Sequence, residues 1–384
     1  MIFNKIRTAT ALLCFALFLG QPENAGAQKI SIGTYTFKNG DVYNGQLVGG
    51  RPNGKGKTQM VNGDTYEGGY LKGKRYGQGT YTFADGEKYV GEWLEDHQHG
   101  YGTFYYNNNN RYEGLWYKDV QQGKGTMYYY NGDYYTGEWV NDRRHGKGTY
   151  VYARGASYTG DWRDDQKSGV GTFAWPDSSK YVGSWLNNMR SGKGTFTYAD
   201  GDYYTGDWVE DNMHGKGIYH FQNGDVYEGP YHDGKRTGVG IYTFANGNKY
   251  SGSFLNGVKS GAVGTFVWAH DGSVYLGAWK NDRRNGKGKL TYGNGDVYEG
   301  FWKDDEMEDT DGILRKKDGS KYKGGFKGSV KHGKCIEVDK DGIRFEGSYN
   351  NGVRHGDFIE RDKTGKVISK GSYNNGKVVN TASL

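Results

Sequence analysis

Cysteine, proline and aliphatic residues are scarce in this chain. Of its 384 residues only 2 are Cys and 4 are Pro, and the mean hydropathy is −0.90. Cys335 is the one cysteine beyond the N-terminal region, so removal of that region would exclude an intramolecular disulfide. The shortage of aliphatic residues excludes a conventional aliphatic core. By itself it would favour disorder, because little apolar surface could offset the entropy of folding.

Glycine and aromatic residues are abundant instead. The chain holds 67 Gly, 35 Tyr, 16 Phe and 10 Trp. Aromatic side chains favour strands and bury a large area each. The composition therefore predicts a folded β protein whose core is built from rings.

The N-terminus differs from the rest of the chain. Lys5 and Arg7 precede an apolar run over residues 11–19, and Ala25-Gly26-Ala27 forms a small-x-small cleavage site. This pattern is typical of a secretory signal peptide over residues 1–27, with cleavage before Gln28 and export to the periplasm, the cell envelope or the medium. The alternative is an uncleaved N-terminal membrane anchor, although the run is short for a bilayer core of about 30 Å.

A tandem repeat occupies nearly all of the remaining chain. The tyrosine of a Tyr-x-Gly triplet recurs every 23 residues. A half-repeat over residues 33–42 precedes this series, and less regular copies begin at Tyr275, Tyr298, Tyr322 and Phe345. The regular copies begin at Tyr43, Tyr66, Tyr89, Tyr112, Tyr135, Tyr158, Tyr181, Tyr204, Tyr227 and Tyr250.

Each repeat contains two segments with a period of two. One copy reads Tyr135-Thr-Gly137-Glu-Trp139, then a polar loop, then Gly146-Lys-Gly148-Thr-Tyr150. A period of two predicts strands, with aromatic residues and glycines on one face and the intervening polar residues on the other. Asn-Gly or Asp-Gly pairs after the second strand predict type I′ hairpin turns at those points.

Glycines beside aromatic rings predict a particular packing. Glycines leave room for neighbouring rings to lie across the backbone, so we expect a ladder of rings on glycines. Single hairpins are marginal in water, so stability should come from stacking repeat on repeat. The predicted fold class is all-β: an elongated, single-layer antiparallel sheet of tandem β-hairpin repeats.

The repeat, with Tyr-x-Gly-x-Trp, His-Gly-x-Gly and an Asn/Asp-Gly turn, resembles the MORN (membrane occupation and recognition nexus) repeat, here of an exported bacterial type. The resemblance implies scaffolding, phosphoinositide contact or self-association, without chemistry of its own. We expect a signal peptide over 1–27, a regular array over 28–311 with a half-repeat and about 11–12 repeats, and divergent basic repeats over 312–384.

Two groups of residues are candidates for binding. The first is the tryptophan series of the aromatic face, which could stack on a ligand if that face is open and could not if the rings are buried. It comprises Trp93, Trp116, Trp139, Trp162, Trp185 and Trp208. The second is a basic run at the start of the C-terminal segment, which holds 16 Lys and Arg against 8 Asp and Glu over residues 313–384. Its members include Arg315, Lys316, Lys317, Lys321 and Lys323.

Other motifs favour structural readings. His99, His145 and His214 all precede a repeat glycine, so equivalent side chains lie about 10 Å apart, too far to share a zinc ion. Gly-Lys-Gly strings lack the Ser or Thr of a phosphate loop. The acidic stretch 304–311 matches a calcium loop only in part, and a solvated loop is expected. We therefore expect no metal, no cofactor and no enzymatic activity.

The sequence favours a non-enzymatic scaffold at the cell envelope that mediates protein–protein contact or self-association, for example as a homodimer. The alternative is binding of anionic phospholipid or cell-surface glycan through the aromatic face and the basic C-terminal end. Export disfavours nucleic acid as a partner.

Overall fold

The computed structural model describes residues 29–383, which form two compact units, one up to residue 120 and one from residue 121. The signal peptide expected over residues 1–27, with its cleavage site, lies outside the described residues. Every regular element in the described part is a β-strand. No helix within residues 29–383 is long and apolar enough to cross a membrane.

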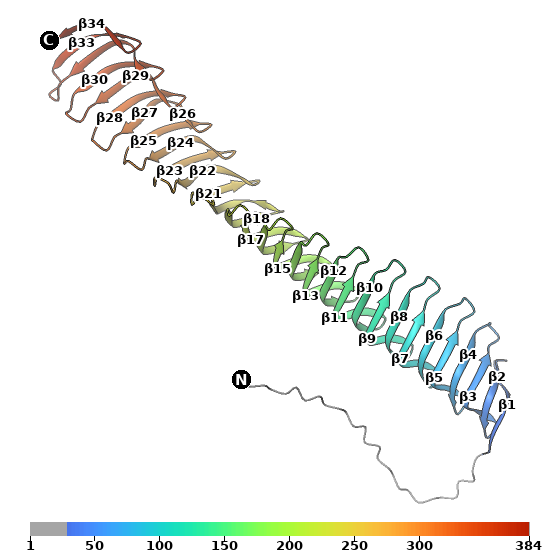
Figure 1. The fold of residues 1–384 in the computed structure, drawn as a ribbon. Coiled ribbons are helices and arrows are strands. Elements are labelled where there is room, and N and C mark those ends of the chain that lie inside the picture. Colours follow the sequence, from blue (N-terminus) through green and yellow to red (C-terminus); the bar gives the residue numbers. More distant parts are fainter. Residues whose placement is uncertain (1–28, 384) are drawn as a thin grey trace, which may run out of the picture. The chain divides into compact units, whose positions relative to one another are not determined.

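The first unit is a row of antiparallel strands, each paired with the next along the chain (Figure 1). These strands are β1 (Ile30–Thr36), β2 (Val42–Val48), β3 (Arg51–Gln59), β4 (Thr65–Leu71), β5 (Lys74–Thr82), β6 (Lys88–Leu94), β7 (His97–Tyr105) and β8 (Arg111–Tyr117).

The second unit continues the same pattern, and its first strand starts at the last residue of the first unit. Its regular strands are β9 (Val120–Tyr128), β10 (Tyr134–Val140), β11 (Arg143–Val151), β12 (Ser157–Arg163), β13 (Gln166–Ala174), β14 (Lys180–Leu186), β15 (Met189–Thr197), β16 (Tyr203–Val209), β17 (Asn212–His220), β18 (Val226–His232), β19 (Lys235–Arg236), β20 (Gly238–Thr243), β21 (Lys249–Leu255), β22 (Val258–Val267), β23 (Val274–Lys280), β24 (Arg283–Thr291) and β25 (Val297–Lys303).

The C-terminal strands of the second unit are shorter or interrupted in places. They are β26 (Glu306–Met307), β27 (Asp309–Arg315), β28 (Lys321–Lys327), β29 (Val330–Val338), β30 (Arg344–Asn350), β31 (Val353–Arg354), β32 (Gly356–Arg361), β33 (Val367–Asn374) and β34 (Lys377–Ser383). Consecutive long strands are antiparallel throughout. The predicted all-β, single-layer antiparallel array of hairpin repeats is confirmed.

The register of one repeat shows how the pattern works. In β10 and β11, Tyr135 faces Tyr150 and Gly137 faces Gly148, after which a bulge shifts the register. Side chains alternate along a strand, so the aromatic residues and glycines occupy one face, which we call the aromatic face. The residues between them, many of them threonine, occupy the opposite face, which we call the threonine face.

The positions of the type I′ turns differ from the sequence prediction. In the loop between the two strands of a repeat, both central residues have positive φ, as at Glu95 (51°) and Asp96 (75°). Two positive φ values define the type I′ turn. At the predicted site, Asp85-Gly86, only Gly86 has positive φ, and its N–H donates to the carbonyl of Phe83. That connection is a type I turn followed by a left-handed glycine, so the type I′ prediction was wrong there.

The ladder of rings on glycines is confirmed. Twelve repeat tyrosines have no exposed surface, among them Tyr135. A Cβ atom on Gly148 would lie 2.2 Å from Tyr135 Oη, so only glycine fits beneath the ring. The Tyr135 hydroxyl donates to the carbonyl of Glu138 at 3.1 Å, which satisfies its polar end.

The less regular copies near the C-terminal end also depart from the repeat in the structure. β22 is 10 residues long and bulges between Gly261 and Gly264 against β23. Asp309 lies where a repeat glycine would be, and its carboxylate accepts the N–H of Phe301 at 2.7 Å. Cys335 replaces the second glycine of its repeat and is buried; burial raises the pKa of its thiol to about 11.

Candidate binding surfaces on the two faces of the sheet

The six candidate tryptophans of the aromatic face lie in the core. The six candidates are between 3% and 6% exposed. In a typical case the Trp162 ring makes edge contacts with Tyr135 and Tyr158, and its Nε1–H donates to the carbonyl of Gly148 at 3.2 Å. The structure therefore places Trp93, Trp116, Trp139, Trp162, Trp185 and Trp208 as packing residues, with no open ring for a ligand to stack on.

A basic residue covers several of these tryptophans from outside. The guanidinium carbon of Arg144 lies 4.6 Å from the ring centroid of Trp162, and its Nε donates to Asp165 Oδ1 at 2.9 Å. Arg190 has the same relation to Trp208 and Asp211. A cation over an indole face adds attraction and removes the ring from solvent. The sequence analysis missed these covering residues, although a basic residue recurs at this position in several repeats.

The threonine face carries a regular pattern of hydroxyls and ion pairs. Thr149 and Thr159 hydrogen bond to each other through Oγ1 at 3.0 Å, and Thr195 and Thr205 do the same. Two residues before such a threonine, on the same face, a lysine faces a carboxylate on the next strand. In one example Lys193 Nζ lies 2.6 Å from Asp207 Oδ1. Paired charges of this kind leave the surface electrostatically neutral.

That pattern breaks between β15 and β21. Lys216 faces Pro230, whereas Lys147 and Lys193 face Asp161 and Asp207, and the Lys216 ammonium forms no ion pair among residues 29–383. Ile218 and Ile241 stand at the threonine position, and Val239 stands at the lysine position. Val239 is 71% exposed, so apolar surface is open to solvent here.

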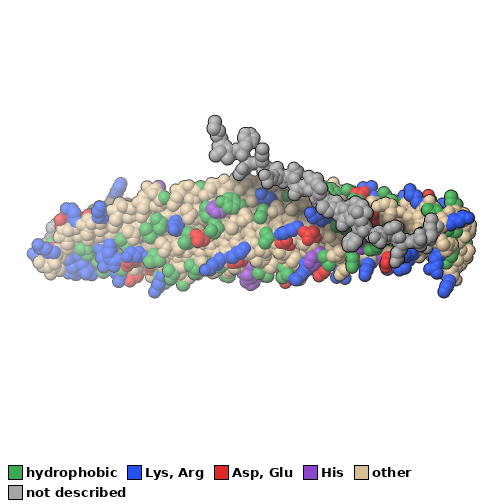
Figure 2. All heavy atoms as spheres, turned by 90° about the horizontal axis from the view of Figure 1, so that it is seen from below, with side chains coloured by type: hydrophobic (Ala, Val, Ile, Leu, Met, Phe, Trp, Pro, Cys, Tyr) green, Lys and Arg blue, Asp and Glu red, His purple; other side chains and the backbone are tan. Residues whose placement is uncertain are grey.

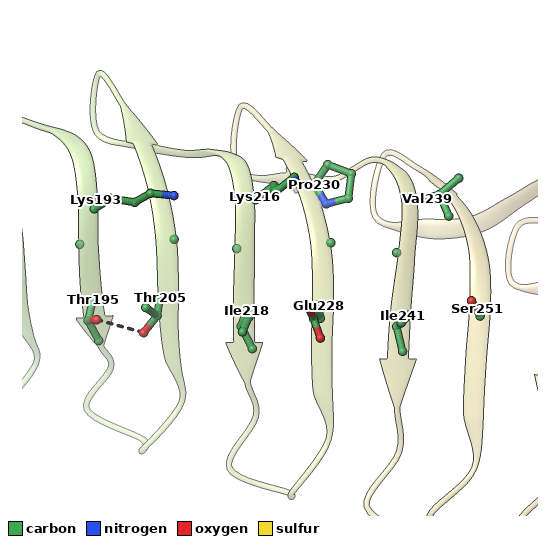
Figure 3. Close-up of a pocket in the computed structure, with 15 residues that line it drawn as sticks. Lys193, Thr195, Thr205, Lys216, Ile218, Glu228, Pro230, Val239, Ile241 and Ser251 are labelled. Carbon is green, nitrogen blue, oxygen red and sulfur yellow. Dashed lines mark hydrogen bonds between the residues drawn. The ribbon is translucent and has the colours of Figure 1, made fainter.

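These residues line a hollow of about 880 Å³ on the threonine face (Figure 3). Figure 3 shows their side chains on the same side of strands β15–β18, β20 and β21, with the Thr195–Thr205 hydrogen bond at one end. A pocket with apolar walls and few polar groups is the usual form of a binding site. The labelled lining residues are Lys193, Thr195, Thr205, Lys216, Ile218, Glu228, Pro230, Val239, Ile241 and Ser251.

A hollow of similar volume in the first unit has a different lining. It measures about 840 Å³ and is lined by charged and polar side chains, including Lys55 and Glu67, together with Tyr76 and Val90. A hollow therefore follows from the repeat itself. The hollow of the second unit differs in its aliphatic side chains, Ile218, Val239 and Ile241.

The basic candidates lie at the C-terminal end of the second unit. Arg315, Lys316, Lys317, Lys321 and Lys323 are all exposed. Figure 2 shows basic side chains gathered at the left end of the molecule, over the C-terminal strands. Arg315 pairs with Glu299 and Lys323 with Asp311, each at 3.0 Å. Lys316, Lys317 and Lys321 have no carboxylate partner within the described residues.

The remaining sequence candidates do not form a site. His145 Nδ1 is buried without a hydrogen-bond partner among the described residues and lies 3.9 Å from Asp164 Oδ1. The acidic stretch 304–311 contributes Asp305 to an ion pair with Arg284 at 3.0 Å. Among residues 29–383, no group of three or more His, Cys, Asp or Glu side chains could hold a metal ion.

Comparison with protein families identifies the repeat. The MORN repeat family matches residues 32–42, 43–65, 66–88, 89–111, 112–134, 135–157, 158–180, 181–203, 204–226, 227–249, 275–297, 322–344 and 345–356. A search of curated proteins finds no match.

Several solved structures are similar in part. The Drosophila melanogaster SAS-4 (dCPAP) TCP domain, in complex with a proline-rich motif of Ana2 (dSTIL), is 16% identical, with a TM-score of 0.27, and the match covers 46% of this chain and 90% of that chain. The TCP10 domain of Danio rerio CPAP, with a STIL peptide, is 12% identical at a TM-score of 0.17, over 74% and 99% of the two chains. Virginiamycin B lyase from Staphylococcus aureus is 9% identical at 0.13, over 77% and 93%. At these TM-scores the similarity carries no argument about this chain.

Proposed function

Because the chain belongs to the MORN repeat family, we propose that it is a non-enzymatic scaffold that binds a partner protein in the hollow between β15 and β21. MORN repeats are generally repeat scaffolds for protein or membrane interaction. The observation that supports this proposal is the local loss of the threonine and ion-pair pattern. Exposed apolar surface beside a lysine without a counter-ion suits a partner segment with apolar side chains and a carboxylate.

The leader sequence places this scaffold, in our proposal, at the cell envelope. Lys5, Arg7 and the apolar run over residues 11–19 support export. N-terminal sequencing of the protein from its native host tests this point. A chain that begins at Gln28 supports export with cleavage. A chain that keeps its N-terminal residues contradicts cleavage, and its recovery in the cytosolic fraction of the host cells contradicts export.

The binding site can be tested with peptides selected for affinity. Displayed random peptides would be selected on the full chain, and the best binders would be titrated against two variants. Val239→Asp puts a charge into the hollow, and we expect at least about tenfold weaker binding. Val170→Asp is the matched control, because Val170 has the same position between two repeat glycines and is 59% exposed, yet does not line the hollow.

The selected sequences also report on Lys216. We expect a carboxylate next to apolar residues in the peptides, and a loss of that preference when selection is repeated on Lys216→Gln. Peptides that bind both aspartate variants as tightly as the unmodified chain would place the binding surface elsewhere and contradict the proposal.

A second candidate is binding to an anionic surface through the C-terminal end. The supporting observation is that Lys316, Lys317 and Lys321 are exposed without carboxylate partners. Sedimentation with phosphatidylserine vesicles at low salt tests it, and the triple exchange of these lysines for glutamine should abolish retention. Retention that the triple variant leaves intact would rule this surface out. The six candidate tryptophans do not support the aromatic part of the lipid or glycan hypothesis, because their indole rings are buried.

A further inference from the structure

The first strand of the array is half of a repeat. In β1, Gly33 faces Gly45 and Tyr35 faces Tyr43 of β2. The second strand of a complete repeat, β3, has the same relation to β4, since Gly56 faces Gly68 and Thr58 faces Tyr66. Within the described residues, β1 is therefore a second strand whose own first strand is absent. Within residues 29–383 it pairs with β2, and its outer edge has no further strand beside it.

The missing strand leaves a gap on the aromatic face. In complete repeats, the glycine of the second strand lies under the tyrosine ring of the first strand. A Cβ on Gly56 would be 2.2 Å from the ring of Tyr43, and one on Gly79 would be 2.2 Å from Tyr66 Oη. A Cβ on Gly33 would meet only Leu47 Cδ1, at 3.2 Å. The space above Gly33 could therefore hold an aromatic ring, but no ring of the described residues occupies it. We call this space the seat on Gly33.

The complete repeats define what would fit this seat. The ring comes from a residue opposite the Tyr35 position, and a glycine two residues later faces Gly33, as Tyr43 and Gly45 do in the next hairpin. The residue after that glycine accepts a backbone N–H through its side chain, as Glu92 Oε1 accepts the N–H of Tyr101 at 3.2 Å. The residue of β1 at that position is Ile32. The matching segment has the pattern aromatic-x-Gly-acidic.

A second copy of the chain cannot supply this pattern from its own edges. If two β1 strands pair with Gly33 against Gly33, Ser31 lies opposite Tyr35, and no ring reaches the seat. If Tyr35 lies opposite Tyr35, Phe37 faces Gly33 in place of a glycine. β34, the last strand, contains neither glycine nor an aromatic residue. The Tyr-x-Gly strands are already part of a sheet.

We infer that the outer edge of β1 accepts an extended segment of a different protein that carries the aromatic-x-Gly-acidic pattern, added as a further antiparallel strand. Strand addition gains main-chain hydrogen bonds along the edge, and the ring in the seat on Gly33 gives specificity. The edge is suited to pairing, because residues 30–36 include no charge and no proline, and Ile30 and Ile32 are 69% and 86% exposed. This site is distinct from the hollow between β15 and β21.

The probe is a synthetic peptide with the sequence of residues 87–95, Glu-Lys-Tyr-Val-Gly-Glu-Trp-Leu-Glu, labelled at its N-terminus. Fluorescence anisotropy would follow its binding to two proteins. One is the full chain, and the other is a chain that starts at Gln28 and keeps every described residue. We expect saturable one-to-one binding and slower amide exchange over residues 30–36. Exchange of the peptide tyrosine for alanine should weaken binding at least about tenfold, because the ring is then missing.

The matching variant is Gly33→Val, which fills the seat from the protein side. The backbone of Gly33 is not left-handed, and only the flexible end of Leu47 lies nearby, so the variant should fold. We expect at least about tenfold weaker peptide binding, whereas Thr34→Val, on the threonine face of the same strand, should change it less than about twofold. Failure of the peptide to bind either chain, or equal binding by Gly33→Val, would overturn the inference. So would a concentration-dependent dimer that Gly33→Val abolishes, because a second copy would then occupy the edge.

Discussion

The hairpin of β10 and β11 and the strands β28–β32 solve the same packing problem in different ways. In the first, Tyr135 lies across Gly137 and Gly148. In the second, Cys335 stands at the second glycine position and Glu337 stands where regular repeats have an aromatic residue, a methionine or a threonine. Both regions keep a buried repeat aromatic, Tyr135 and Tyr322.

The C-terminal core is held by paired charges. Glu337 Oε2 accepts the hydroxyl of Tyr349 at 2.9 Å and Nη2 of Arg354 at 3.0 Å, and Lys331 binds its other oxygen. Burial acts to raise the pKa of Glu337, but these partners together hold it below the ordinary value of 4.5. The two regions together show that a buried carboxylate can replace an aromatic ring in this sheet when each of its oxygens has a hydrogen-bond or ion-pair partner. A buried charge without such partners would be destabilising.

Alkaline pH should have the largest effect, and it should act on the regular repeats. Burial raises the pKa of Tyr181, Tyr250 and Tyr275 from 10.0 to about 12. A raised pKa means that the fold favours the protonated phenol, so this stability is complete below about pH 10 and is lost as the pH rises through about 12. Circular dichroism and tyrosinate absorbance are recorded together, and we expect the buried tyrosines to ionise only as the strand signal is lost above pH 10. Ionisation of every tyrosine with the sheet intact would contradict the burial.

A side chain at a covered glycine should be the most damaging substitution. Gly148→Val forces a branched side chain against the ring of Tyr135 and should lower the free energy of unfolding by about 3 kcal/mol. Lys147→Val is the control, because Val170 naturally occupies that position in the next repeat, and a change of about 0.5 kcal/mol or less is expected. Urea unfolding of both variants makes the comparison. Equal stabilities would mean that the ring does not need the glycine.

Removal of the buried charge should affect the C-terminal strands. Glu337→Gln leaves Lys331 and Arg354 without their shared carboxylate and should cost about 2 kcal/mol. Because the pKa of Glu337 is lowered, its stabilisation is present above about pH 4.5 and is lost as the pH falls further. Alkylation of the buried Cys335 at neutral pH measures local opening and should be faster in the variant. Urea unfolding at about pH 3 and about pH 7 tests the acid dependence, which should be smaller in the variant.

A control separates this network from surface charge. Glu346→Gln removes two ion pairs, with Arg344 and Arg361, on the threonine face, where the carboxylate is 34% exposed. It should leave the alkylation rate of Cys335 nearly unchanged. If both variants accelerate alkylation equally, the buried network has no special role.

Loss of a covering arginine should have the smallest effect. Arg144→Met removes the contact with Trp162 and the bond to Asp165, and should lower stability by about 1 kcal/mol. Met213 already occupies this position in β17, so the fold tolerates the exchange. Arg143→Met, at an exposed neighbour, is the control for thermal unfolding measurements. A loss of stability as large as that of Gly148→Val would show that the arginine over the indole ring matters as much as the glycine beneath the tyrosine ring.

The repeat, the strands and the rings on glycines could be predicted from the sequence, because each is encoded within about 23 residues. Tyr135, Gly137 and Gly148 carry the local packing directly. The two-residue turns were missed, although an Asn or Asp recurs at the Asp96 position, because glycine pairs gave a stronger turn signal. Asn and Asp tolerate left-handed backbone well enough to form these turns.

The accessible face and the hollow could not be predicted in the same way. Alternation assigns Trp162 and Thr159 to opposite faces, but whether Arg144 and neighbouring rings then cover the indole depends on contacts between repeats. The hollow did leave a signal, since Ile218, Pro230 and Val239 depart from the threonine and ion-pair pattern. Such departures indicate a binding surface only when the face that they share is known to be exposed to solvent.

The hydrogen bonds between successive turns have a consequence for how such a chain can change in length. Asp133 Oδ1 accepts the N–H of Ala153 at 2.8 Å, a partner 20 residues away, and Asp202 accepts the N–H of Gln222 in the same way at 2.7 Å. Each repeat therefore forms the same contacts with the repeat before it and with the repeat after it. Duplication or loss of one 23-residue unit in the gene would restore these contacts at the new junction. An insertion of a single residue must instead be absorbed within one repeat, as the bulge in β22 does.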